Sequence, residues 1–159
     1  MKMTKAEREF HRRTAAEAFN KAWDYLDMKG RSSEDDLEML RLAHASRYHW
    51  GLVGTPENQA VGDWQTSRIY AALGQPDLAL RFAESALSTC REHGLHETEL
   101  AAHEGIARAY AIGMDAKKAK RSLARARSLL DGLSLEKEDR EIYLDQITDT
   151  QNLIDRLRS

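Results

Sequence analysis

Few residues in this sequence form cross-links or interrupt helices. The 159 residues include one cysteine, two prolines and nine glycines. The lone Cys90 cannot form an internal disulfide, which is typical of proteins from reducing compartments. No apolar stretch approaches the roughly 18 residues that a membrane span needs, and the N-terminal segment MKMTKAEREFHRR has no apolar signal core. We therefore expect a soluble, cytoplasmic protein without a membrane partner.

The sequence also lacks an excess of charge and the usual catalytic motifs. It has 24 Lys and Arg against 26 Asp and Glu, a net charge of -2, so it does not carry the basic footprint of a nucleic-acid-binding domain. It contains no glycine-rich phosphate loop, no H-E-x-x-H motif and no nucleophile elbow. These absences predict a protein that is not an enzyme, needs no cofactor and binds no nucleic acid.

What is abundant is Ala, Leu, Glu, Arg and Lys, the residues that favour α-helix. Gly, Pro and capping residues divide the chain into seven predicted helices. Ser33, followed three residues on by Asp36, is the predicted N-cap of the second helix, Thr55 caps the third ahead of Pro56, and Ser134 starts the last. The predicted ranges are 5–28, 33–54, 56–74, 76–94, 96–112, 115–132 and 134–158.

A repeat relates the middle helices. Tyr70, Ala79 and Ala86 recur 40 positions later as Tyr110, Ala119 and Ala126. Alanines seven residues apart lie on nearly one face of a helix, where they let a neighbouring helix approach closely. Two helix pairs are therefore predicted to follow one plan, and such pairs bury their faces only by stacking.

The stretch YAALGQPDLALRFAESAL, from Tyr70, resembles the tetratricopeptide repeat (TPR) in its tyrosine, small residues and turn glycine. The resemblance implies an all-α fold, a right-handed TPR-like α-solenoid, in a single domain over 1–159. It would consist of a degenerate first hairpin (5–54), a second (56–94), a third (96–132) and a capping helix (134–158). Trp23 is an approximate match in the first hairpin.

The predicted last helix carries Tyr143, Ile147, Ile154 and Leu157 in one apolar stripe. This pattern is typical of a cap that covers the last repeat. An alternative is that the stripe is the seam of a homodimer, which would make the protein an assembly unit.

The resemblance places the first helix of each pair along a concave groove. Trp64, Gln65 and Arg68 then face that groove from one helix, and Glu104 and Arg108 occupy equivalent positions on the next. Arginine forks pair with carboxylates, so the groove is predicted to bind an extended acidic peptide or a peptide C-terminus. The alternative is that the arginines pair with internal acids such as Asp63 or Glu104, with Trp64 buried between the helix pairs.

Three other segments carry polar side chains. A zinc site is a third hypothesis, because a set of potential ligands crosses one turn: Cys90, His93, His96, Glu99 and His103. It would make the chain a metal-binding protein, or a metal-dependent enzyme that uses His96, Glu99 and His103. AHASRYHW, from Ala43, aligns with the second helix of a repeat, so Ala43 and Ser46 are predicted to be core residues. DAKKAKRSLARARS holds six Lys and Arg, which we expect to form a solvated face neutralised by the acidic last helix.

Overall fold

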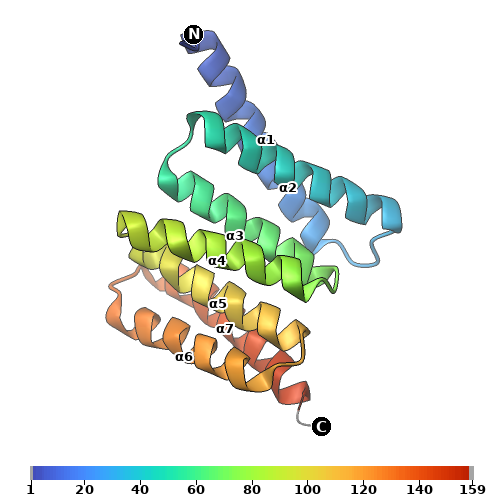
Figure 1. The fold of residues 1–159 in the computed structure, drawn as a ribbon, viewed down its shortest axis with the longest axis vertical. Helices are drawn as coiled ribbons and strands as arrows, with labels where there is room; N and C mark the ends of the chain where they lie inside the picture. The colour runs from blue at the N-terminus through green and yellow to red at the C-terminus, as the bar shows by residue number, and fades with distance from the viewer. Residues whose placement is uncertain (1, 158–159) are drawn as a thin grey trace.

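The computed structural model describes residues 2–157, which form seven α-helices and no strand (Figure 1). The all-helical prediction is confirmed, although the predicted end of the last helix, at residue 158, lies outside the described residues. None of these seven helices has the length and apolar character needed to cross a membrane. The helices are α1 (Lys5–Asp27), α2 (Ser33–Val53), α3 (Pro56–Ala72), α4 (Pro76–His93), α5 (His96–Ile112), α6 (Ala116–Gly132) and α7 (Lys137–Arg156).

Capping residues set the starts of the first three helices. Thr4, Ser32 and Thr55 each accept a hydrogen bond from the backbone N–H three residues later, and a side chain at that position bonds back to the cap. Each pair of bonds satisfies donors that the helix leaves free. For α2 the predicted cap, Ser33, is off by one residue, because Ser32 pairs with Asp35.

The start of α7 differs more from its prediction. The helix begins at Lys137, three residues after Ser134. Leu133 and Leu135 both pack against the core around α5, α6 and α7, and alternate residues share a side in extended chain. The connection therefore stays extended over these residues and becomes helical only beyond them.

The turns that end α3 and α5 have the same geometry. Gly74 has φ 71° and Met114 has φ 65°, so both are left-handed. The next backbone N–H donates to the carbonyl of Tyr70 in the first turn and of Tyr110 in the second, at 2.9 Å each. Such bonds satisfy the last carbonyls of a helix and reverse the chain.

Helices that follow one another in sequence are also neighbours in space. Figure 1 shows α1 to α6 in succession along the long axis, and each contacts the one before and after it. In addition, α3 contacts both α1 and α5, while α7 contacts α5 and α6. The helices α1, α3, α5 and α7 therefore form one side of the molecule.

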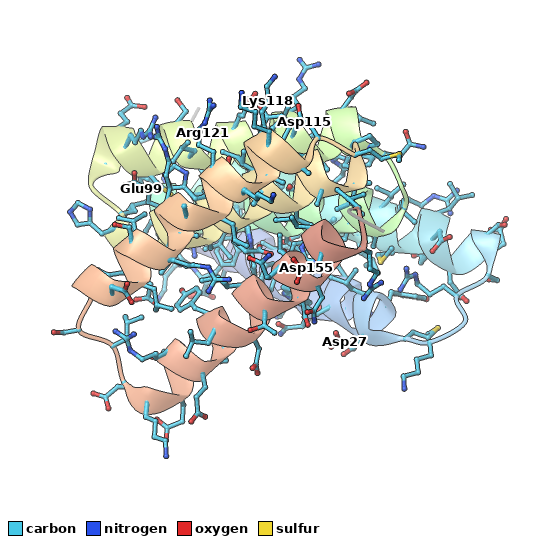
Figure 2. The ribbon with its side chains drawn as sticks, turned by 90° about the horizontal axis from the view of Figure 1, so that it is seen from below. Asp27, Glu99, Asp115, Lys118, Arg121 and Asp155 are labelled. Carbon is cyan, nitrogen blue, oxygen red and sulfur yellow. The ribbon has the colours of Figure 1, made fainter. Side chains whose placement is uncertain are left out.

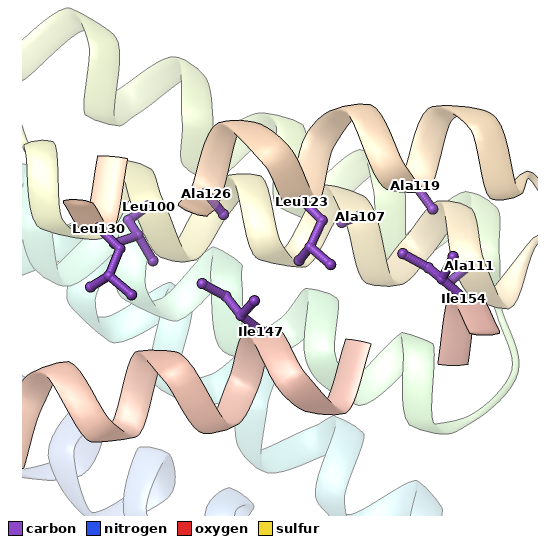
Figure 3. Close-up of a cluster of buried hydrophobic side chains, with 9 residues drawn as sticks. All are labelled: Leu100, Ala107, Ala111, Ala119, Leu123, Ala126, Leu130, Ile147 and Ile154. Atoms are coloured by element: carbon purple, nitrogen blue, oxygen red, sulfur yellow. The ribbon is translucent and has the colours of Figure 1, made fainter. Parts of the chain in front are cut away.

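The largest core cluster joins the last three helices. Leu123 and Leu130 of α6 form it with Ile147 and Ile154 of α7, around Leu100 of α5 (Figure 3). All five side chains are at most 2% exposed. The predicted apolar stripe of α7 is therefore used inside the chain, as expected of a cap.

Candidate functional site

Four of the five side chains predicted to line a groove contact one another in sequence: Trp64, Arg68, Glu104 and Arg108. Arg68 and Arg108 line one cavity of about 350 Å³, whereas Trp64 lines a separate one of about 200 Å³. Gln65 and Glu104 are completely buried, and Trp64 is 9% exposed. The side chains of Arg68 and Arg108 keep 15% and 14% of their surface. The structure thus differs from an open groove lined by all five residues.

Glu104 is the centre of this cluster. Its Oε1 lies 3.1 Å from Nε and 2.9 Å from Nη2 of Arg108. Thr150 of α7 donates a hydrogen bond of 2.6 Å to the same oxygen. Nη1 of Arg68 lies 3.7 Å from Oε2. One buried carboxylate therefore faces two guanidinium groups, as the alternative of internal pairing predicts for Glu104.

Arg68 is held mainly by aromatic rings. Its guanidinium carbon lies 5.7 Å from the ring centre of Trp23 in α1 and 5.6 Å from that of Trp64, which precedes it in α3. Its Nε and Nη1 are buried and form no hydrogen bond within residues 2–157. Burial lowers the pKa of Arg68, and the nearby Glu104 carboxylate opposes that shift. Arg68 is therefore oriented by its neighbours while its donors stay unused.

A cavity of about 350 Å³ adjoins the two arginines. It lies between the C-terminal parts of four helices, and among the residues that the structure describes Asp27, on the exposed end of α1, is its only acidic lining residue. Two cations and the exposed carboxylate of Asp27 thus line the cavity, and the buried Glu104 faces both cations. The lining residues are Leu26, Asp27, Arg68, Ala71, Ala72, Arg108, Ile112 and Leu153.

Residues outside the repeat explain why the groove is partly closed. Gln65 donates its side-chain N–H to the carbonyl of Phe19 in α1, at 2.9 Å, and Thr150 covers Glu104 from α7. The 40-residue repeat has no counterpart for α7, so no signal pointed to Thr150. The sequence indicated Trp23 only weakly, because its separation from Trp64 is one residue longer than the 40-residue period of the repeat.

The proposed zinc ligands do not converge. Within residues 2–157 no three His, Cys, Asp or Glu side chains are placed to hold one metal ion. Cys90 is completely buried, and burial raises the pKa of its thiol to about 11. His103 instead contacts Glu99 at 3.6 Å. The geometry therefore does not support the zinc hypothesis.

AHASRYHW is mostly structural. Ala43 and Ser46 are buried as predicted, and Ser46 donates a hydrogen bond to the carbonyl of Ala15 at 2.8 Å. Arg47 forms an ion pair of 2.8 Å with the buried Asp63. Asp63 therefore pairs with Arg47 of α2 and is not the partner of Arg68 or Arg108.

No family model matches the chain, and comparisons with curated proteins and with solved structures gave no match. The likeness to TPR proteins therefore stays a prediction that rests on the internal repeat.

Proposed function

We propose that this chain is a non-enzymatic, cytoplasmic binding module that holds the carboxylate of an acidic protein segment between Arg68 and Arg108. In this proposal the helices form a right-handed, TPR-like α-solenoid of three hairpins with α7 as its cap. The succession of helix contacts and the matching turns at Gly74 and Met114 support that arrangement. The ligand cavity belongs to the side formed by α1, α3, α5 and α7.

One observation carries the proposal: two arginines border a cavity whose acidic lining residue, Asp27, is exposed, while Glu104 pairs with both arginines from the buried side. A carboxylate in the cavity would contact the part of the Arg68 side chain that stays exposed, 15% of its surface, and the guanidinium of Arg108 beside it. Charge-assisted hydrogen bonds of this kind are the stronger ones in proteins. The apolar side chains of Leu26, Ile112 and Leu153 would contact the aliphatic part of the ligand.

The rings of Trp23 and Trp64, which lie against each other at an angle of 50°, would fix the direction of the Arg68 fork before the ligand arrives. Preorganisation of this kind reduces the entropy lost on binding. Glu104 and Thr150 would position Arg108 in the same way. Trp64, Gln65 and Glu104 then serve as supporting residues, and the two arginines as the contacts.

The test is an array of random 12-residue peptides, each made with a free and with an amidated C-terminus. The wild-type chain should select acidic peptides, and Arg68→Gln should weaken their binding about tenfold or more, the size expected for a lost charge-assisted hydrogen bond. Arg127→Gln is the matched control, because Arg127 is exposed and lies outside the cavity.

Selection of basic peptides, or equal binding by Arg68→Gln, would overturn the proposal. If Arg68→Gln unfolds, the NMR signal of the Arg68 Nε–H in the wild type gives a second readout. It should move when a selected peptide is added and stay in place with a non-selected one.

The alternative function is homodimer assembly through α7, but few apolar side chains of this helix remain exposed for an interface. Ile147 and Ile154 are buried inside the chain, so a dimer seam on α7 would rely on Ile142 and Leu144, which are 53% and 43% exposed. Solution mass of wild type and of Ile142→Ser/Leu144→Ser separates the two functions. A dimer that the double variant converts to a folded monomer would favour assembly.

A further inference from the structure

A second cationic site lies between α4 and α6, away from Arg68 and Arg108. Two adjoining cavities of about 240 and 260 Å³ share Arg91 of α4, His103 of α5 and Arg125 of α6. Lys118 and Arg121 extend the lining along α6. Four Lys and Arg side chains thus border one cleft in a chain whose net charge is -2.

The sequence had led us to expect that the acidic last helix neutralises these charges. The structure shows a different arrangement. Arg127 reaches α7, where it bonds to the neutral side chain of Gln151 at 3.2 Å. Figure 2 shows Lys118 and Arg121 on the side of α6 away from Asp155 of α7. The helix α6 therefore turns these cations toward α4.

Acidic side chains near the cleft are few and already engaged. Glu99 is the only acid among the described residues that line the two cavities. It lies 3.5 Å from Arg91 and 3.6 Å from His103. Lys118 has a contact of 3.9 Å with Asp115 at the edge of the cleft.

Arg121 and Arg125 are the cations without compensation. Neither side chain forms an ion pair or hydrogen bond within residues 2–157. They are four residues apart, so they extend from the same face of α6. Both are exposed and free to direct their guanidinium forks at one anion.

We infer that this cleft binds a phosphate monoester, presented as a phosphorylated side chain of a partner protein segment. A phosphate monoester carries a charge of about -1.5 to -2 at neutral pH and three strong acceptor oxygens, which suits several converging cations. The hydroxyl groups of Tyr110 and Ser122 line the same cavity and supply further donors, while Leu87 and Ile106 offer apolar contact to the flanking residues.

A polynucleotide fits these observations less well. Nucleic-acid binding relies on a track of cations that neutralises many successive phosphates. Here the cations converge on one short cleft, and the chain as a whole is acidic. The site also does not depend on the cavity at Arg68, because the two share no lining residue.

His103 provides a reporter inside the site. Burial lowers its pKa, Glu99 opposes the shift, and Arg91 and Arg125 lower the pKa further. A bound dianion would add negative charge beside the imidazole and thus raise the pKa of His103. Binding elsewhere on the surface would leave this ring unaffected.

The experiment is an NMR titration of the full chain with acetyl-Ala-phosphoserine-Ala-amide, with inorganic phosphate in a separate arm. We expect amide shifts around Arg121 and Arg125, and a higher pKa for the His103 ring in the complex. Arg121→Gln/Arg125→Gln should reduce affinity about tenfold or more. The matched control Lys117→Gln/Lys120→Gln removes the same charge from exposed positions of α6 outside the cleft and should change affinity less than about twofold.

Tighter binding of the phosphopeptide than of inorganic phosphate supports a protein ligand. The inference is overturned if both double variants lose affinity equally, if the His103 pKa does not change, or if acetyl-Ala-Glu-Ala-amide binds as well. Tighter binding of a ten-residue oligothymidylate at the same residues would also overturn it, in favour of nucleic acid.

Discussion

In the α3–α4 hairpin the left-handed turn residue is Gly74, and in the α5–α6 hairpin it is Met114, yet both turns form the same hydrogen bonds. The small packing residues agree as well, since Ala86 and Ala126 are both completely buried. The backbone plan of the two hairpins is therefore set by turn geometry and by small residues at helix contacts, and it tolerates a change of side chain at the turn.

The hairpins differ in the polar groups that they bury at equivalent positions. Where α3 has Asp63 and Trp64, α5 has His103 and Glu104. All four are at most 9% exposed. Asp63 pairs with α2, whereas Glu104 bridges two arginines and α7. Both candidate sites lie beside these differing residues. The repeat therefore sets the backbone arrangement, and the positions at which the two hairpins differ provide the polar and charged groups.

The largest expected effect on stability is at Glu104, one of the positions at which the two hairpins differ. Glu104→Leu should lower the free energy of unfolding by about 3–5 kcal/mol, because it leaves Arg68 and Arg108 without their buried anion. Urea unfolding followed by circular dichroism measures the change. The same substitution at the exposed Glu84 of α4 should alter stability by less than about 0.5 kcal/mol. A loss below 1 kcal/mol at Glu104 would mean that the arginines are satisfied without it.

The buried alanines test how alike the hairpins are. Ala86→Leu and Ala126→Leu should each lower the free energy of unfolding by about 1–3 kcal/mol, because each forces extra volume between packed helices. Ala124→Leu, on the exposed face of α6, is the control. Chemical unfolding of all three variants gives the comparison. Strongly unequal losses at the two buried sites would show that the hairpins do not share one packing plan.

A smaller effect is expected at the two turns. Gly74→Ala should destabilise the chain by about 1 kcal/mol and Met114→Gly should stabilise it by a similar amount, because only glycine adopts the left-handed conformation freely. A Cβ at Gly74 would meet no atom within 4 Å, so the effect there is conformational. Thermal unfolding measures both variants, with Gly132→Ala as a control without a positive φ. A stabilising Gly74→Ala or a destabilising Met114→Gly would refute the shared turn geometry.

The smallest expected effect is on the pH dependence of stability. It concerns His103, which occupies in α5 the position that Asp63 occupies in α3. Burial lowers the pKa of His103 below its ordinary value of 6.5. The unfolded chain then binds a proton at a higher pH than the folded chain, so the stability due to neutral His103 is present above pH 6.5 and declines as the pH falls below it. His44 and His49 contribute in the same direction. In His103→Gln the fall in stability between pH 7 and 5 should be shallower than in wild type, and an unchanged slope would contradict this assignment.

Sequence patterns predicted most of the helix boundaries. The bounds of α5 agree with their prediction, and Thr55 and Pro56 open α3 as expected. An error occurred where two neighbouring residues are both suited to cap a helix, as Ser32 and Ser33 are at the start of α2. The candidate site was predicted less completely: the two arginines and Glu104 were found through the repeat, whereas Trp23 and Thr150 come from segments that the repeat does not describe.

The sequence by itself determined the all-helical structure, the turns and the spacing of the small packing residues. These depend on hydrogen bonds and side-chain contacts within a few residues, or on a pattern that occurs twice. Only the tertiary structure decided that α7 covers Glu104, that two tryptophans pack against Arg68 and that Arg121 and Arg125 line a cleft beside α4. Those outcomes depend on which distant side chains meet, because burial and charge compensation are set by neighbours that local sequence does not specify.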